Sequence, residues 1–157
     1  MITKKLLGAL LMLICSIGSL WAADPFVGTW KLNVPKSKFA KGREVKELTL
    51  TTVEQGDNVM VTVIGTSGEG KPVSVKYTVP AKGGSLNYTE GAPPAGTTVV
   101  AKRVDANTVD FTVTMNGKQV AIDHCVLSAD GKTLTNNRNS IDASGNAAKW
   151  TEVFNRQ

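Results

Sequence analysis

Short glycine-containing turn motifs interrupt this chain of 157 residues at nearly regular intervals. They occur at 55–58, 67–70, 82–84, 116–117, 130–131 and 144–145. The runs between them are rich in Val, Thr and Ile, a pattern typical of antiparallel strands joined by hairpins. We predict strands over residues 27–34, 46–54, 59–66, 72–80, 85–89, 97–104, 108–115, 118–128, 132–141 and 147–155. No helical period of useful length competes with them, so the fold class is all-β.

Consecutive hairpins indicate a single up-and-down antiparallel β-barrel of about 8–10 strands with little helix, because closure removes both sheet edges. Gly28 and Trp30 open the first predicted strand, and we expect them to form the structural closure of the barrel, with the first strand paired to the last. An open sandwich usually needs longer connections between its sheets. A membrane barrel would need an apolar lipid-facing band, whereas residues 108–114 alternate apolar side chains with Thr and Asp.

The first residues have the pattern of a secretory leader. Lys4 and Lys5 precede an uncharged apolar run over 6–20, and Ala22-Ala23 provides small residues for cleavage. We therefore expect a signal peptide over 1–23, cut after Ala22 or Ala23, and a single β-barrel domain over 24–157 that is exported to the periplasm or the extracellular space. The run is too short for a membrane span of ~20 residues, and Ile14 before Cys15 argues against lipidation.

Charge and cysteine content exclude several function classes. The formal net charge of +5 becomes +3 after cleavage, because Lys4 and Lys5 leave while all 13 acidic residues stay. No basic stripe with interleaved aromatics is present, so no nucleic-acid partner is expected. Only Cys125 remains beside a single His124, which cannot form a zinc site of the usual ligands. We expect no metal, no cofactor, no catalytic residue and no stable membrane insertion; Cys125 is either a small half-buried strand residue or the link of a disulfide dimer.

Turn chemistry sets a register for the last strands. Asn116-Gly117 is a strong two-residue hairpin signal that pairs Met115 with Lys118. Treating the next two turns as type I turns closed by glycine pairs Ser128 with Lys132 and repeats the pattern over 142–146. The predicted opposite pairs are Val113–Val120, Phe111–Ile122, Val109–His124, Val126–Leu134, His124–Asn136, Ile122–Arg138, Arg138–Trp150, Asn136–Glu152 and Leu134–Phe154.

This register predicts a binding surface inside the barrel. The predicted ligand-binding residues are Phe111, Ile122, His124, Asn136, Arg138, Trp150 and Glu152. Two roles for Arg138 are open: it holds a polar head such as a carboxylate together with His124 and Asn136, or it pairs with Glu152 and stacks on Trp150. Neighbouring strand residues face opposite sides, so His124 and Cys125 are not expected to form a catalytic dyad. Asp110 and Asp123 are expected to face each other on the outside.

Several motifs resemble those of small exported bacterial lipocalin-like (calycin-type) β-barrel proteins. They are Gly28-Thr29-Trp30-Lys31-Leu32-Asn33, Lys36-Ser37-Lys38-Phe39, Asp105-Ala106-Asn107-Thr108, Asp130-Gly131-Lys132-Thr133-Leu134 and the ending Val153-Phe154. The resemblance implies a barrel in which a late basic residue, Arg156 or Arg138, stacks on the first-strand tryptophan. That group has no agreed activity, so the resemblance implies a fold rather than a function.

These observations predict an exported small-molecule binding protein that holds an amphipathic or apolar ligand inside its barrel. The alternative is an envelope protein-interaction or structural module with a filled barrel core and no ligand.

Overall fold

The computed structural model describes residues 23–141 and 144–157. The predicted leader, Cys15 included, therefore lies outside the described residues except for Ala23. No helix in the described part of the chain is long and apolar enough to cross a membrane.

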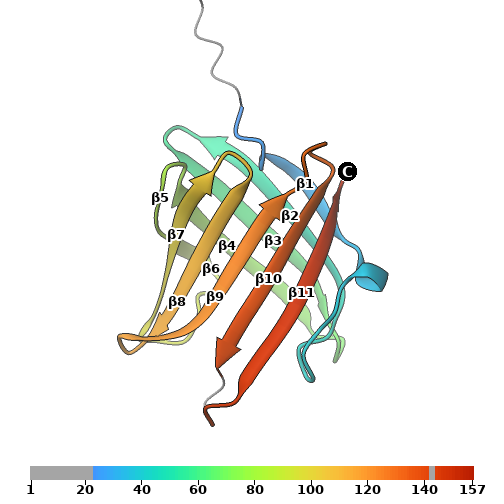
Figure 1. The fold of residues 1–157 in the computed structure, drawn as a ribbon, viewed down its shortest axis with the longest axis vertical. Helices are drawn as coiled ribbons and strands as arrows, with labels where there is room; N and C mark the ends of the chain where they lie inside the picture. Colours follow the sequence, from blue (N-terminus) through green and yellow to red (C-terminus); the bar gives the residue numbers. More distant parts are fainter. Residues whose placement is uncertain (1–22, 142–143) are drawn as a thin grey trace, which may run out of the picture.

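The regular secondary structure of the described chain is almost entirely β (Figure 1). Its 11 strands are β1 (Gly28–Leu32), β2 (Val45–Gln55), β3 (Asn58–Ser67), β4 (Pro72–Pro80), β5 (Gly83–Ser85), β6 (Asn87–Glu90), β7 (Thr97–Asp105), β8 (Thr108–Met115), β9 (Lys118–Leu127), β10 (Thr133–Ile141) and β11 (Ala147–Arg156). The helical element is one short 3-10 turn, η1 (Val34–Lys36). The all-β prediction is confirmed.

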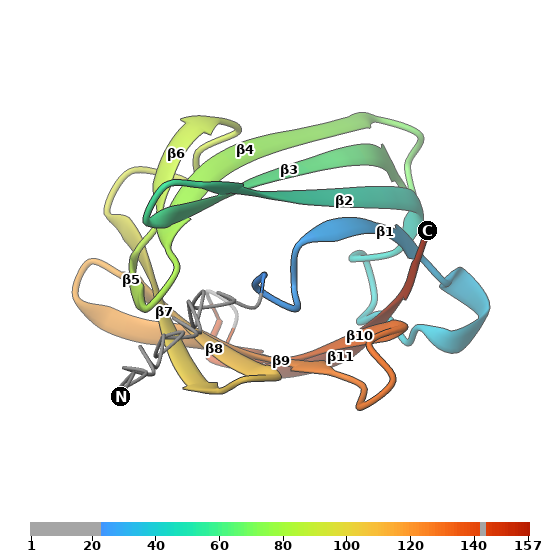
Figure 2. The same ribbon diagram turned by 90° about the horizontal axis from the view of Figure 1, so that it is seen from above.

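All strands belong to one antiparallel sheet of order β5-β7-β8-β9-β10-β11-β1-β2-β3-β4-β6. The predicted strand over 85–89 is divided in two around Leu86: β5 pairs with β7, whereas β6 pairs with β4. Because β5 and β6 are successive pieces of one segment, that segment joins the two ends of the sheet. The sheet curls into a nearly closed barrel, seen from above in Figure 2.

The first and last strands close the other side of the barrel, as the sequence predicts. β1 pairs with β11, with Trp30 opposite Arg156 and Leu32 opposite Phe154. Trp30 is 0% exposed and belongs to a core cluster that also contains Leu127 and Leu134. Burial of such large apolar side chains is the main stabilising contribution at this seam.

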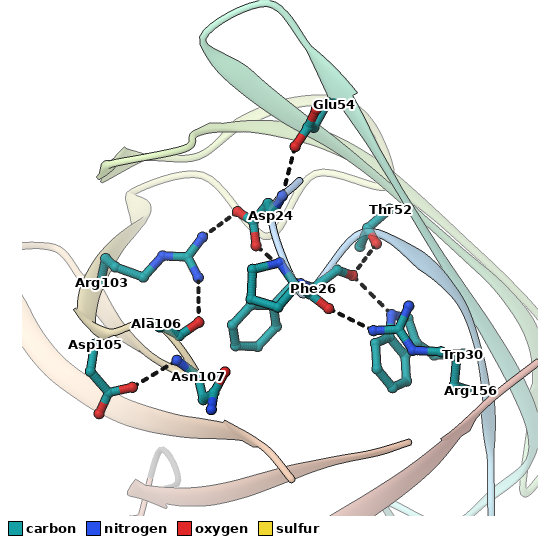
Figure 3. A network of polar contacts seen from close by, with 11 residues as sticks. Asp24, Phe26, Trp30, Thr52, Glu54, Arg103, Asp105, Ala106, Asn107 and Arg156 are labelled. Carbon is teal, nitrogen blue, oxygen red and sulfur yellow. Dashed lines mark hydrogen bonds and ion pairs between the residues drawn. The ribbon is translucent and has the colours of Figure 1, made fainter. Parts of the chain in front are cut away.

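The segment 24–27 folds back across one end of the barrel (Figure 3). Asp24 forms an ion pair with Arg103, and its backbone N–H donates to Glu54 Oε1 at 2.8 Å. The Phe26 carbonyl accepts hydrogen bonds from Trp30 Nε1 at 3.0 Å and from Thr52 Oγ1 at 2.5 Å. Contacts from three strands, β1, β2 and β7, therefore hold this segment in place.

Arg156 on β11 also holds this segment in place through hydrogen bonds. Its guanidinium donates to the carbonyls of Val27 at 2.7 Å and Pro25 at 2.6 Å, and Nε donates to the Gly131 carbonyl at 2.7 Å. Gly28 makes room for this group, because a Cβ there would lie 2.6 Å from Arg156 Nη1. Glycine at this position thus permits the approach of a side chain from the last strand.

The predicted register fails within β9. Met115 pairs with Lys118 as expected, with Asn116 and Gly117 at φ of 50° and 78°. A β-bulge then places Val113 opposite Ala121, so Val120 is an extra residue in β9. One extra residue reverses the side of the sheet on which each later side chain of the strand lies, relative to the predicted register.

The turn between β9 and β10 is also longer than predicted, because the Ser128 N–H donates to the Thr133 carbonyl and Leu134 pairs with Leu127. The pairs His124–Asn136 and Ile122–Arg138 are therefore wrong; Cys125 faces Asn136 and Asp123 faces Arg138. The last hairpin is confirmed, with Arg138–Trp150, Asn136–Glu152 and Leu134–Phe154 paired as predicted.

Candidate ligand-binding site

A cavity of about 460 Å³ lies inside the barrel. Most of its wall is apolar, with side chains that include Leu48, Leu50, Val61, Val63, Val79 and Phe111. Alternation along the strands places these residues on the inner face, as predicted for Phe111.

One patch of the cavity wall is polar and comes from β9, β10 and β11. Its residues are Asp123, Cys125, Asn136, Arg138 and Glu152, all of which line the cavity. Arg138 Nη1 donates to Asp123 Oδ2 at 2.9 Å, and Asn136 Nδ2 donates to Glu152 Oε2 at 3.0 Å. The Cys125 thiol donates to Asn136 Oδ1 at 3.3 Å. We call these five residues the polar patch.

The partner of Arg138 differs from the one predicted. Arg138 pairs with Asp123 rather than Glu152, because the bulge in β9 turns Asp123 inward. Its guanidinium carbon lies 5.2 Å from the centre of a Trp150 ring, so the predicted stacking on Trp150 is present. Asp123 Oδ1 and Arg138 Nε are buried and have no hydrogen-bond partner among the described residues. Each therefore retains capacity for one more polar contact.

Burial changes the acidity of both carboxyl groups in the polar patch. It raises the pKa of Asp123 to about 6, against the lowering effects of the Arg138 charge and of the neighbouring Asn136 amide. Burial likewise raises the pKa of Glu152, although the hydrogen bond from Asn136 and the charge of Arg138 oppose the shift. Poor solvation of the charged forms is the common cause.

Two tyrosines that the sequence reasoning did not select also line the cavity. Tyr77 on β4 and Tyr88 on β6 have ring centres 5.3 Å apart, and burial raises the pKa of each phenol. Tyr77 shares one face of β4 with Val73, Val75 and Val79, in alternation with polar residues. That alternation was a usable signal for an inward-facing side chain.

Other predicted site residues lie elsewhere. His124 and Ile122 face outward, so their predicted interior position is wrong; His124 Nδ1 lies 2.5 Å from Asp110 Oδ1 on the outer face. Asp110 accordingly faces His124 and not Asp123. Trp150 is half-buried and packs beside Arg138.

The described residues contain no group of three or more His, Cys, Asp or Glu side chains arranged to hold a metal ion. Cys125 lines the interior, where burial raises its thiol pKa. A disulfide between two copies of the chain therefore has no support in this structure.

No protein-family model matches the sequence, and no curated protein matches it significantly. Solved structures do resemble the barrel. The zebrafish ileal bile acid-binding protein in complex with cholic acid has a TM-score of 0.53 and 14% identity over 85% of this chain and 99% of that one. EF1p2_mFAP2b bound to DFHBI has a TM-score of 0.51 and 13% identity over 87% of this chain and 97% of that one. The chain has a lipocalin-like fold.

Similarity at such low identity concerns the fold and carries no ligand with it. Within this lipocalin-like barrel, the expected late basic residue on the first-strand tryptophan is Arg156, whose guanidinium carbon lies 4.1 Å from the centre of a Trp30 ring. Arg138, the alternative, stacks on Trp150 instead. Arg156 thus belongs to the closed seam, and Arg138 belongs to the cavity.

Proposed function

We propose that this lipocalin-like protein binds a small apolar or amphipathic molecule inside its barrel. The observation that carries the proposal is the interior cavity of about 460 Å³, which lies in the ~300–1,000 Å³ range of small-molecule sites. Its largely apolar wall suits an apolar body, and the polar patch suits one polar group.

The structurally similar proteins named above were solved with cholic acid and DFHBI, which supports small-molecule binding as the use of such a barrel. The alternative, an interaction module with a filled core, requires side chains to occupy the interior. A cavity of this size does not favour it.

Titration of delipidated protein with Nile red, a neutral apolar fluorophore, tests the proposal. Saturable fluorescence enhancement is expected. Val63 lines the cavity, so the larger side chain of Val63→Trp occupies part of the cavity volume. This variant is expected to weaken Nile red binding at least about tenfold. Ile64→Trp is the matched control, because the neighbouring Ile64 faces outward and is 58% exposed. Absence of saturation with folded protein, or equal loss in both variants, would overturn the proposal.

Export is part of the same proposal and rests on the leader pattern over 1–23. Expression of the full chain in a bacterial host, followed by fractionation and N-terminal sequencing, is expected to give a processed form outside the cytoplasm that begins at Ala23 or Asp24. An unprocessed cytoplasmic product would contradict it.

A further inference from the structure

We propose that the polar patch selects a cationic head group, so that the ligand of this barrel is an amphipathic amine and not a fatty acid or another organic anion. This inference rests on the proposed function, because it names the chemical class of the molecule held in the same cavity.

Acidic side chains outnumber basic ones along the cavity wall. Three carboxylates line it, Asp24, Asp123 and Glu152, against two guanidinium groups, Arg103 and Arg138. Asp24 is paired with Arg103, and Asp123 with Arg138. Among the described residues, Glu152 has no cationic partner within ion-pair distance and accepts its hydrogen bond from the neutral amide of Asn136. One negative charge in the cavity therefore lacks a counter-charge.

Asp123 supplies a second, independent indication of a missing donor. The residue is 7% exposed and lines the cavity, yet its Oδ1 has no hydrogen-bond partner in the described structure. A buried acceptor without a partner is unfavourable, because it has lost its hydrogen bonds to water without gaining another. An ammonium group has three donors and no acceptor, so it matches both the unpaired oxygen and the excess negative charge.

A carboxylate ligand fits the same patch poorly. Arg138, the residue that would receive it, already holds Asp123 through Nη1 at 2.9 Å, which leaves Nε as its buried donor without a partner among the described residues. An anionic head would add a third negative charge beside Asp123 and Glu152, in a site where burial weakens screening. Like charges in such proximity are unfavourable.

The apolar wall defines the rest of the ligand. Leucine, valine and phenylalanine side chains form most of the cavity surface away from the patch. Hydrophobic burial supplies affinity for the ligand body, while the head group decides among ligands with the same body. Selectivity is therefore best measured with molecules that differ only in the head.

Displacement of Nile red by dodecylamine, dodecanol and dodecanoate provides this comparison. Dodecylamine and dodecanoate are used below their critical micelle concentrations and dodecanol below its solubility limit, all at mildly alkaline pH, where the amine is protonated and the acid ionised. Dodecylamine is expected to bind about 10- to 100-fold more tightly than dodecanoate, with dodecanol between them. Tighter binding of dodecanoate in the wild type would overturn the inference and leave the proposed function standing. Loss of all saturable binding, Nile red included, would overturn the proposed function itself.

Three variants locate the selectivity. Glu152→Gln keeps the shape and an oxygen for Asn136 but removes the unpaired charge, and it is expected to reduce the ratio of dodecylamine to dodecanoate affinity about tenfold. Asp123→Asn releases Arg138 and is expected to increase dodecanoate affinity.

Glu69→Gln is the control, because Glu69 pairs with Lys71 on the surface, where both side chains are about three-quarters exposed. Thermal unfolding monitored by circular dichroism verifies that each variant is folded. An amine preference that survives Glu152→Gln unchanged would contradict the assignment.

Discussion

The guanidinium of Arg156 lies against the ring of Trp30, with its carbon 4.1 Å from the ring centre, and the two residues face each other across the paired first and last strands. The same guanidinium donates to three backbone carbonyls, two of them in the segment that crosses the end of the barrel. One side chain therefore joins the seam of the barrel to its end cover.

Arg156→Ala is expected to lower the free energy of unfolding by about 2–4 kcal/mol, because it removes a cation–π contact and leaves three carbonyls without a donor. Arg156→Lys is expected to recover only a small part of the lost free energy of unfolding, since an ammonium cannot reproduce the planar arrangement of donors in a guanidinium. Urea unfolding measures both variants. Lys71→Ala, on the surface, is expected to change stability by no more than about 0.5 kcal/mol. Full recovery by lysine would show that charge alone matters at this position.

Gly28→Ala is expected to destabilise the protein by at least about 2 kcal/mol, because φ at this position is +142° and the new Cβ would lie 2.6 Å from Arg156 Nη1. Gly131→Ala is the comparison. Gly131 also has a positive φ, +69°, but a Cβ there meets no atom within 4 Å, so a loss of about 1 kcal/mol is expected. Equal losses of unfolding free energy in the two variants, measured by urea unfolding, would show that a clash with Arg156 does not cause the destabilisation by Gly28→Ala.

Stability is expected to fall as the pH rises from about 4 to about 6. The pKa of Asp123 is raised from 3.8 to about 6 in the folded protein, so in this window the native state binds more protons than the unfolded chain. The loss attributable to this carboxyl is about 3 kcal/mol in total, and it is complete above about pH 6. The raised pKa of Glu152 acts in the same direction.

Urea unfolding at a series of pH values tests this dependence. Asp123→Asn is expected to flatten the profile between pH 4 and 6, leaving the smaller slope that Glu152 contributes. A wild-type profile that rises through this window would contradict the burial of an ionisable group at position 123.

Cys125 offers a natural reporter of cavity occupancy. Its thiol lines the cavity, and burial together with the Asp123 and Glu152 carboxylates raises its pKa. Because the thiolate is the reactive form, iodoacetamide is expected to label the folded protein at least about tenfold more slowly than the unfolded chain. A bound ligand is expected to slow labelling further. Equal rates in the folded and unfolded states would place the thiol outside the barrel.

Local chemistry determined much of the fold. Glycine-containing turns and Val/Thr-rich runs located nearly all the strands, and the Asn116-Gly117 dipeptide correctly began its hairpin. The pairing of β10 with β11 was also predictable, so Asn136, Arg138 and Glu152 were correctly placed on one face. The inward position of Tyr77 was predictable because it shares one strand face with Val73, Val75 and Val79, although it was not selected.

The composition of the polar patch was decided by tertiary structure. Strand β9 carries apolar side chains on both parities, with Val120, Ile122 and Val126 against Ala121, Cys125 and Leu127, so alternation alone cannot choose its inner face. The bulge at Val120 and the longer turn after Ser128 make that choice through pairing with β8 and β10. They turn His124 outward and Asp123 inward. Turn motifs depend on a few consecutive residues and can be identified in the sequence. A one-residue bulge depends instead on how paired strands fit the curvature of the barrel.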